Sequence, residues 1–131
     1  MEDVRYGFGR DLELEPDAAI ARVTEALKGE GFGVLTRIDV HEVMKAKLGL
    51  DMPAYVILGA CNPKLASAAI GTEPQVGLLL PCNVLVKARA GGGSTVSFAD
   101  PKAMGAMTDN AAMGPLMADA AERLERALNA C

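Results

Sequence analysis

Two alternating segments joined by three glycines constrain the fold of this chain more than any other feature. Residues 84–89 alternate small apolar side chains with longer or charged ones, and residues 95–98 alternate threonine and serine with valine and phenylalanine. Alternation of this kind predicts strands with one buried face. Gly91, Gly92 and Gly93 lie between them and suit a tight turn. The sequence therefore predicts a β-hairpin here, and with it a mixed or antiparallel sheet.

Helical and strand patterns alternate along the rest of the chain. Apolar spacing and capping residues predict helices near 16–28, 40–48, 62–71 and 110–129. Strands are expected near 4–14, 32–38 and 54–60, with an interrupted apolar segment at 76–80 before Pro81. This order predicts one domain over residues 1–131. The expected fold is α+β: a two-layer α/β sandwich with a mixed or antiparallel sheet of about five strands and flanking helices.

Composition narrows the classes of function. Half of the 131 residues are hydrophobic, which suffices for a core, and the net charge of −4 argues against a nucleic-acid-binding protein. No apolar run is long enough to span a bilayer, and the acidic start at Met1–Arg5 does not resemble a signal peptide. We therefore expect a cytoplasmic protein with reduced thiols and no integral membrane segment.

Two cysteine segments are the strongest candidates for a functional site. Cys61-Asn62 ends the apolar run at 54–60 and precedes a predicted helix, while Cys82-Asn83 follows Pro81. The amides at the start of a helix lower the pKa of a nearby thiol, and burial raises that pKa. The same amides can also bind an anion. The alternative is that Cys61 is a small apolar core residue. The spacing suits adjacent strands joined by a helix, so we expect the two thiols to approach each other.

The resulting hypothesis is a module that binds a small ligand or sulfur species at a paired-cysteine site. Its expected lining is Cys61, Asn62, Pro81, Cys82 and Asn83. A second hypothesis is a thiol- or persulfide-transfer enzyme with Cys61 as nucleophile and Cys82 as the other candidate catalytic residue. A third is a structural, homodimeric interaction subunit. Nothing in the sequence identifies a cofactor, and two lone cysteines lack the spacing of a zinc site.

Other candidate residues carry weaker signals. His41 is the only histidine, so a Cys–His dyad requires it to reach a cysteine. Four methionines between 104 and 117 offer thioether ligands for Cu(I), but at helical spacing they more often fill a core or a dimer surface. Three acidic residues in turns are candidate general bases: Asp51, Glu73 and Asp100.

Several of these segments together resemble a known family. The segments 31–40, 55–63 and 77–84, with Glu73-Pro74 and Asp100-Pro101, are similar to the pattern of the domain of unknown function 302 family. The resemblance covers roughly residues 15–130. It implies a compact α/β sandwich and a homodimer, and it implies no established reaction.

Overall fold

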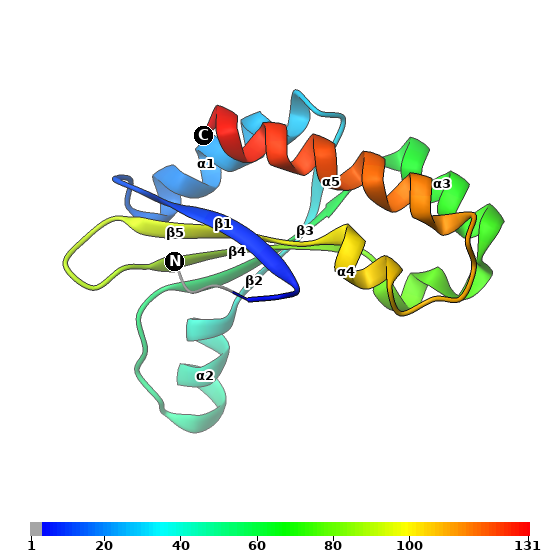
Figure 1. The fold of residues 1–131 in the computed structure, drawn as a ribbon. Coiled ribbons are helices and arrows are strands. Elements are labelled where there is room, and N and C mark those ends of the chain that lie inside the picture. Colours follow the sequence, from blue (N-terminus) through cyan, green and yellow to red (C-terminus); the bar gives the residue numbers. More distant parts are fainter. Residues whose placement is uncertain (1–3) are drawn as a thin grey trace.

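Five strands form one antiparallel sheet in the computed structural model, which describes residues 4–131 (Figure 1). The spatial order is β1-β5-β4-β3-β2. The strands are β1 (Gly7–Leu12), β2 (Gly33–Asp39), β3 (Tyr55–Cys61), β4 (Cys82–Ala88) and β5 (Ser94–Ala99). The helices are α1 (Pro16–Lys28), α2 (Val40–Leu48), α3 (Pro63–Thr72), the 3₁₀ helix η1 (Pro74–Leu79), α4 (Pro101–Gly105) and α5 (Met113–Ala130).

Local chemistry explains the predicted hairpin and the first helix. Gly91, Gly92 and Gly93 have φ of 87°, 114° and 82°, a backbone region that side chains rarely tolerate. Their conformation turns β4 back onto β5. Pro16 occupies the first turn of α1, Asp17 follows it, and Lys28 lies in the last turn, where its charge suits the helix dipole.

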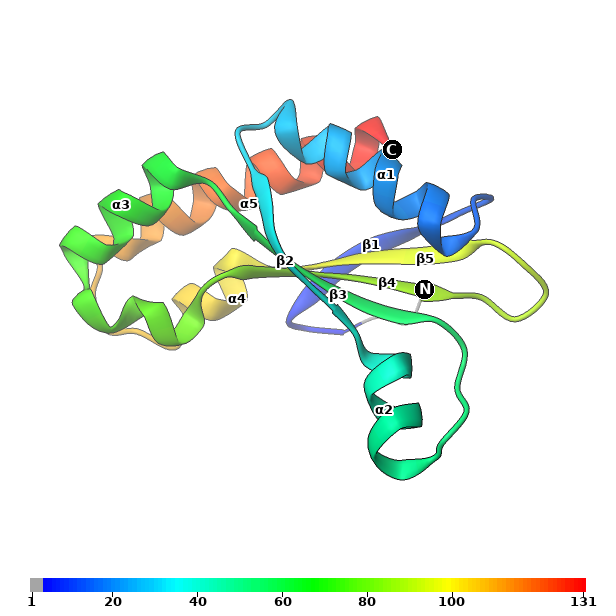
Figure 2. The same ribbon diagram turned by 180° about the vertical axis from the view of Figure 1, so that it is seen from behind.

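Helices cover only one face of the sheet. Buried side chains of α1 and α5, among them Val23, Leu27 and Leu124, pack against the inward positions of the strands, such as Val86 and Phe98. Figure 2 shows α1, α3 and α5 together on one side of the sheet and α2 on the other. We call the side away from α1 and α5 the open face.

Helix α2 is attached to the fold by few contacts. It buries none of its residues, and its main packing partner is β3. The Nδ1 atom of His41 accepts a hydrogen bond from the backbone N–H of Tyr55 at 3.0 Å. This bond joins the first turn of α2 to the start of β3.

The predicted fold class is confirmed, with one difference in detail. Segment 76–80 is not an interrupted strand: its first four residues belong to η1, because Pro74 starts a helical turn and Val76 packs into a small cluster with Ala69 and Met113. The apolar run 54–60 forms most of the interior strand β3, whose inward residues are buried, while Tyr55 and Ile57 on its other face remain partly exposed.

Candidate functional site

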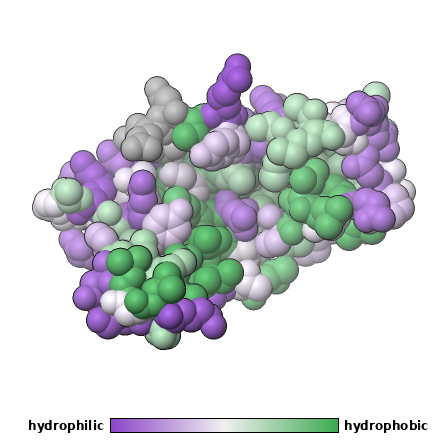
Figure 3. All heavy atoms as spheres, turned by 90° about the horizontal axis from the view of Figure 1, so that it is seen from below, coloured by the Kyte–Doolittle hydropathy of each residue, from purple (hydrophilic) through white to green (hydrophobic). Residues whose placement is uncertain are grey.

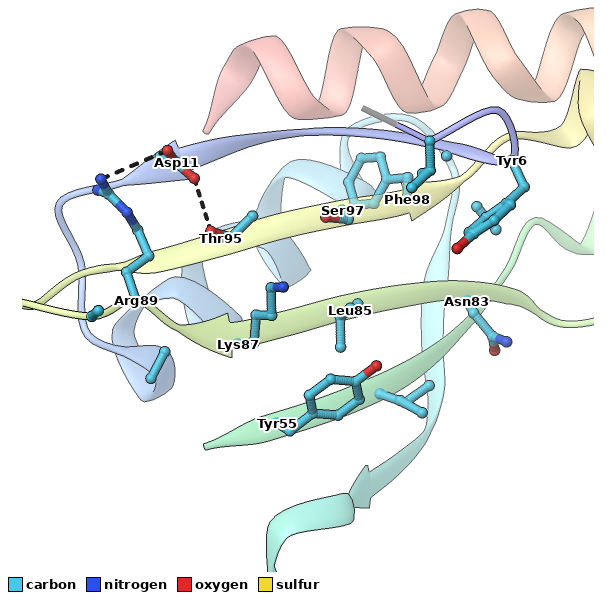
Figure 4. Close-up of a pocket in the computed structure, with 16 residues that line it drawn as sticks. Tyr6, Asp11, Tyr55, Asn83, Leu85, Lys87, Arg89, Thr95, Ser97 and Phe98 are labelled. Carbon is cyan, nitrogen blue, oxygen red and sulfur yellow. Dashed lines mark hydrogen bonds and ion pairs between the residues drawn. The ribbon is translucent and has the colours of Figure 1, made fainter. Parts of the chain in front are cut away.

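A groove of about 850 Å³ runs across the open face, and we call it the sheet groove (Figure 4). Its floor consists of outward-facing residues of β1, β5, β4 and β3, with Tyr6 at one end. Figure 3 looks onto this side of the molecule and shows apolar side chains gathered on α2 beside a more polar region. It is much larger than the small apolar pocket of about 40 Å³ on the helix-covered side.

A polar row crosses the sheet groove at one end. The strand register places Asp11 opposite Thr95, Thr95 opposite Lys87, and Lys87 opposite Tyr55. Directly opposed side chains of neighbouring strands lie about 5 Å apart at Cβ. Four strands thus bring a carboxylate, a hydroxyl, an ammonium and a phenol into one line.

Asp11, at the acidic end of this row, already has partners within the fold. Thr95 Oγ1 donates a hydrogen bond to Asp11 Oδ1 at 2.8 Å, and Arg89 Nη2 lies 3.7 Å from Asp11 Oδ2. The hydrogen bond from Thr95 is the main influence that lowers the pKa of Asp11, with the positive charge of Arg89 acting in the same direction against desolvation. Asp11 is therefore held ionised, and it offsets the charge of Arg89.

Lys87 occupies a different electrostatic position. It lies on the central strand of the sheet, is partly buried, and makes no hydrogen bond or ion pair with any of residues 4–131. Figure 4 shows its side chain between Thr95 and Tyr55, without a dashed line to either. A cation without a carboxylate partner in a groove favours binding of an anion.

The next rows of the sheet groove are apolar and small. In the row next to the polar row, two residues further along each strand, Leu85 lies between Ile57 and Ser97. Ser97 in turn lies opposite Gly9. Two residues further, Asn83 lies opposite Gly59 on β3, and Ala99 of β5 lies opposite Gly7. The groove thus combines a polar end, an apolar middle and a polar amide at Asn83.

The predicted cysteine pair is not formed. Cys61, Cys82 and Cys131 are free, and the register places Cys82 opposite Ala60 rather than opposite Cys61. The expectation that the two segments lie at adjacent strand ends is correct, but the cysteines are one register position apart. Both cysteines nevertheless line one small apolar pocket, together with Asn62 and Pro81, and Cys61 lies close enough to contribute to the raised pKa of Cys82. No paired-cysteine site exists in the part of the chain that the structure describes.

The surroundings of Cys82 also argue against a reactive thiolate. It packs beside the main core on the helix-covered side and lines an apolar pocket of about 40 Å³, together with residues of α3, η1 and α5. Burial raises the pKa of Cys82 to about 11, and the nearby Cys61 adds a smaller effect in the same direction. The Cys82 thiol is protonated at neutral pH.

The remaining predicted ligands divide between the two sides of the sheet. Asn62 is buried and caps α3: its Oδ1 accepts a hydrogen bond from the backbone N–H of Leu65 at 3.2 Å, and its Nδ2 donates to Glu30 O at 3.4 Å. Asn83 instead lines the sheet groove. Pro81 is exposed and lies close to Gly59, where an added Cβ would come within 2.9 Å of Pro81 Cγ.

His41 lies far from the cysteines, whereas Met104 and Met117 line the same small apolar pocket as Cys61 and Cys82. His41 contacts the start of β3, whereas Cys61 ends that strand six residues later, a separation of about 20 Å. Met113 is fully buried in a small cluster that Met117 packs against, and Met107 is exposed. The methionine segment is thus chiefly packing material, as its helical spacing favoured.

The three candidate general bases have structural partners outside the sheet groove. Glu73 accepts a hydrogen bond from Thr108, Asp51 lies 2.8 Å from Lys45 Nζ, and Asp100 caps α4 through the backbone N–H of Lys102. Within residues 4–131, no group of three His, Cys, Asp or Glu side chains is arranged to hold a metal ion.

Sequence reasoning missed the sheet groove itself. The hairpin sequence contained one indication of this groove: Leu85, Lys87 and Arg89 alternate with the buried valines and therefore share the other face of the sheet. The charged members looked like ordinary solvent-facing residues. Only the register shows that Tyr55, Thr95 and Asp11 join them in one row.

None of the helices in the described part of the chain is both long and apolar enough to cross a bilayer.

Comparisons with known proteins agree with this fold. The crystal structure of an uncharacterized conserved protein DUF302 from Bacillus stearothermophilus superposes with a TM-score of 0.89 at 32% sequence identity, covering 98% of this chain and 99% of that one. No curated protein matches the chain. The model of the domain of unknown function DUF302 matches residues 8–131. The chain therefore belongs to the DUF302 family.

Proposed function

We propose that this protein is a binding module that holds a small molecule in the sheet groove. The observation that carries the proposal is the cross-strand row Asp11–Thr95–Lys87–Tyr55 on the floor of an 850 Å³ groove. Small-molecule sites typically combine a concave apolar surface with a few polar groups that fix orientation. Ile57 and Leu85 supply the apolar part here, and the row supplies the polar part.

The construction of the floor supports a binding role. Ile57, Leu85, Lys87 and Thr95 project from strands whose other faces pack into the main core. Groups on paired strands are held more rigidly than groups on loops, so little ordering entropy is lost when a ligand binds.

Amide NMR spectra of the ¹⁵N-labelled protein, recorded with a library of small molecules, test this proposal. A ligand is expected to shift the signals of Leu85, Lys87 and Thr95, and not those of α3 or α5. Leu85→Trp fills the middle of the groove and should abolish these shifts. Leu78→Trp is the matched control, because Leu78 is 84% exposed on η1, outside the groove.

The same spectra separate this proposal from the other hypotheses. Shifts centred on Cys61 and Cys82 would favour the sulfur-species site, and a persulfide donor that modifies Cys61 would favour the transfer enzyme. Ligand binding to Leu85→Trp with wild-type affinity would contradict the sheet groove as the site. A spectrum that changes with protein concentration alone, with no ligand found, would favour the structural homodimer.

A further inference from the structure

We infer that the sheet groove selects an organic anion with an apolar body, its anionic group on Lys87 and its body across Leu85. This inference rests on the proposed function and names the chemical class of the ligand. It depends on which charges in the groove are already neutralised and on how polar and apolar residues are arranged along β4.

Lys87 is the cation available to a ligand. Arg89, the other cation of the groove, lies 3.7 Å from the Asp11 carboxylate, which also accepts the Thr95 hydroxyl. An anion at Arg89 would meet the negative charge of Asp11. Lys87 has no such neighbour within residues 4–131, and its cross-strand neighbours Thr95 and Tyr55 bear hydroxyl groups. The Thr95 hydroxyl already donates to Asp11, so the ammonium of Lys87 and the phenol of Tyr55 are the groups that suit a carboxylate or another oxyanion.

The residues beyond Lys87 suit an apolar body rather than a second charge. Leu85 and Ile57 are direct cross-strand partners and lie one row from Lys87 on the same face. Both are partly exposed in the groove, so an apolar ligand that covers them removes their surface from water.

The far end of the groove limits the length of the ligand. Asn83 follows Leu85 on the same face of β4, and Pro81 and Thr36 approach Gly59 beside it. Lys87 and Asn83 are four residues apart on one strand, which corresponds to about 13 Å. A ligand that spans the groove is therefore a single anionic group on a body of medium length.

Octanoate and octan-1-ol form a matched probe pair, because they share the chain and differ in the anionic group. We expect the wild-type protein to bind octanoate about tenfold more tightly than octan-1-ol in NMR titrations at low ionic strength. Lys87→Gln should remove this preference by weakening octanoate binding alone. Lys87→Arg should retain it. Lys64→Gln, on the exposed surface of α3, should behave as the wild type.

The outcomes test two statements separately: that the ligand is an anion held by Lys87, and that the sheet groove binds a ligand at all. Equal affinities for octanoate and octan-1-ol, with groove signals shifted by both, would overturn the anion inference and leave the binding module intact. An octanoate preference that survives Lys87→Gln would overturn the role of Lys87. If neither probe shifts groove signals and no library molecule does so, the proposed function itself fails. Loss of octanoate binding in Leu85→Trp supports both the proposed function and the inference that the apolar body of the ligand lies across Leu85.

Discussion

The thiols of Cys61 and Cys82 differ in their three-dimensional surroundings, although both precede an asparagine. Cys82 lies opposite the buried Ala60 and beside the main core, where burial raises its pKa to about 11. Cys61 lies at the end of β3, where the neighbouring strand offers Gly33. At the scale of single residues, burial sets the pKa of Cys82, and the Cys-Asn dipeptide that it shares with Cys61 does not.

The raised pKa of Cys82 predicts a loss of stability at alkaline pH. In the unfolded chain the thiol ionises near its ordinary pKa of 9.0, while in the folded protein it stays protonated to about pH 11. Its contribution is therefore complete below pH 9 and is lost as the pH rises to 11. The two-unit difference corresponds to about 2–3 kcal/mol.

Urea unfolding of the wild type and Cys82→Ala at pH 8 and pH 11 measures this contribution. The free energy of unfolding of the wild type should fall by about 2–3 kcal/mol more than that of the variant between the two pH values. The comparison cancels the other groups that titrate in this range. Parallel pH dependence of the two proteins would show that Cys82 is not protected from ionisation.

Among the elements, α3 depends most clearly on one residue that also looked functional. Asn62 caps its first turn through Leu65, and the same side chain donates to the carbonyl of Glu30 in the turn after α1. Asn-Pro before an apolar helical segment is a start signal for a helix. With both its oxygen and its nitrogen bonded within the fold, Asn62 acts as a structural cap.

Asn62→Ala should destabilise the protein by about 1–2 kcal/mol, because it removes the cap and leaves the Glu30 carbonyl with Arg123 as its one side-chain donor. Asn62→Asp keeps the oxygen that accepts from Leu65 and should cost less. Asn129→Ala, at an exposed position of α5, is the matched control with little expected change. Urea unfolding checks all three. An unchanged midpoint for Asn62→Ala would remove the capping role.

On the scale of the whole molecule, the two faces of the sheet have different partners. The inner face packs against α1 and α5, while, within residues 4–131, the open face carries the sheet groove and the loosely attached α2. Helix α2 and the residues after it expose Val43, Leu48 and Leu50. A helix with an exposed apolar side usually packs against another surface. This is where we expect the homodimer that the family resemblance implies.

Leu48→Glu tests this expectation, since Leu48 is 72% exposed on α2 and contributes little to the fold of one subunit. The wild type should sediment as a dimer and Leu48→Glu as a monomer, because a carboxylate in an apolar interface is strongly unfavourable. Leu78→Glu, on the distant η1, should remain dimeric. Sedimentation velocity over a range of concentrations measures all three, and a monomeric wild type would contradict the prediction.

The sequence by itself determined the local elements, because their signals lie within short stretches of chain. Alternation and three glycines specified the β4–β5 hairpin, Pro16 specified the start of α1, and Asn62-Pro63 that of α3. The sequence did not predict the helical turn in segment 76–80, since its apolar residues fit a strand as well as a turn of helix.

Only the tertiary structure decided the candidate site. Asp11, Tyr55, Lys87 and Thr95 come from four strands and meet because of register, and an offset of one residue separates Cys82 from Cys61. The side-chain period of a strand is two, so one step of register moves a residue to the other face. Long-range pairing sets that step, and no local pattern in a single sequence contains it.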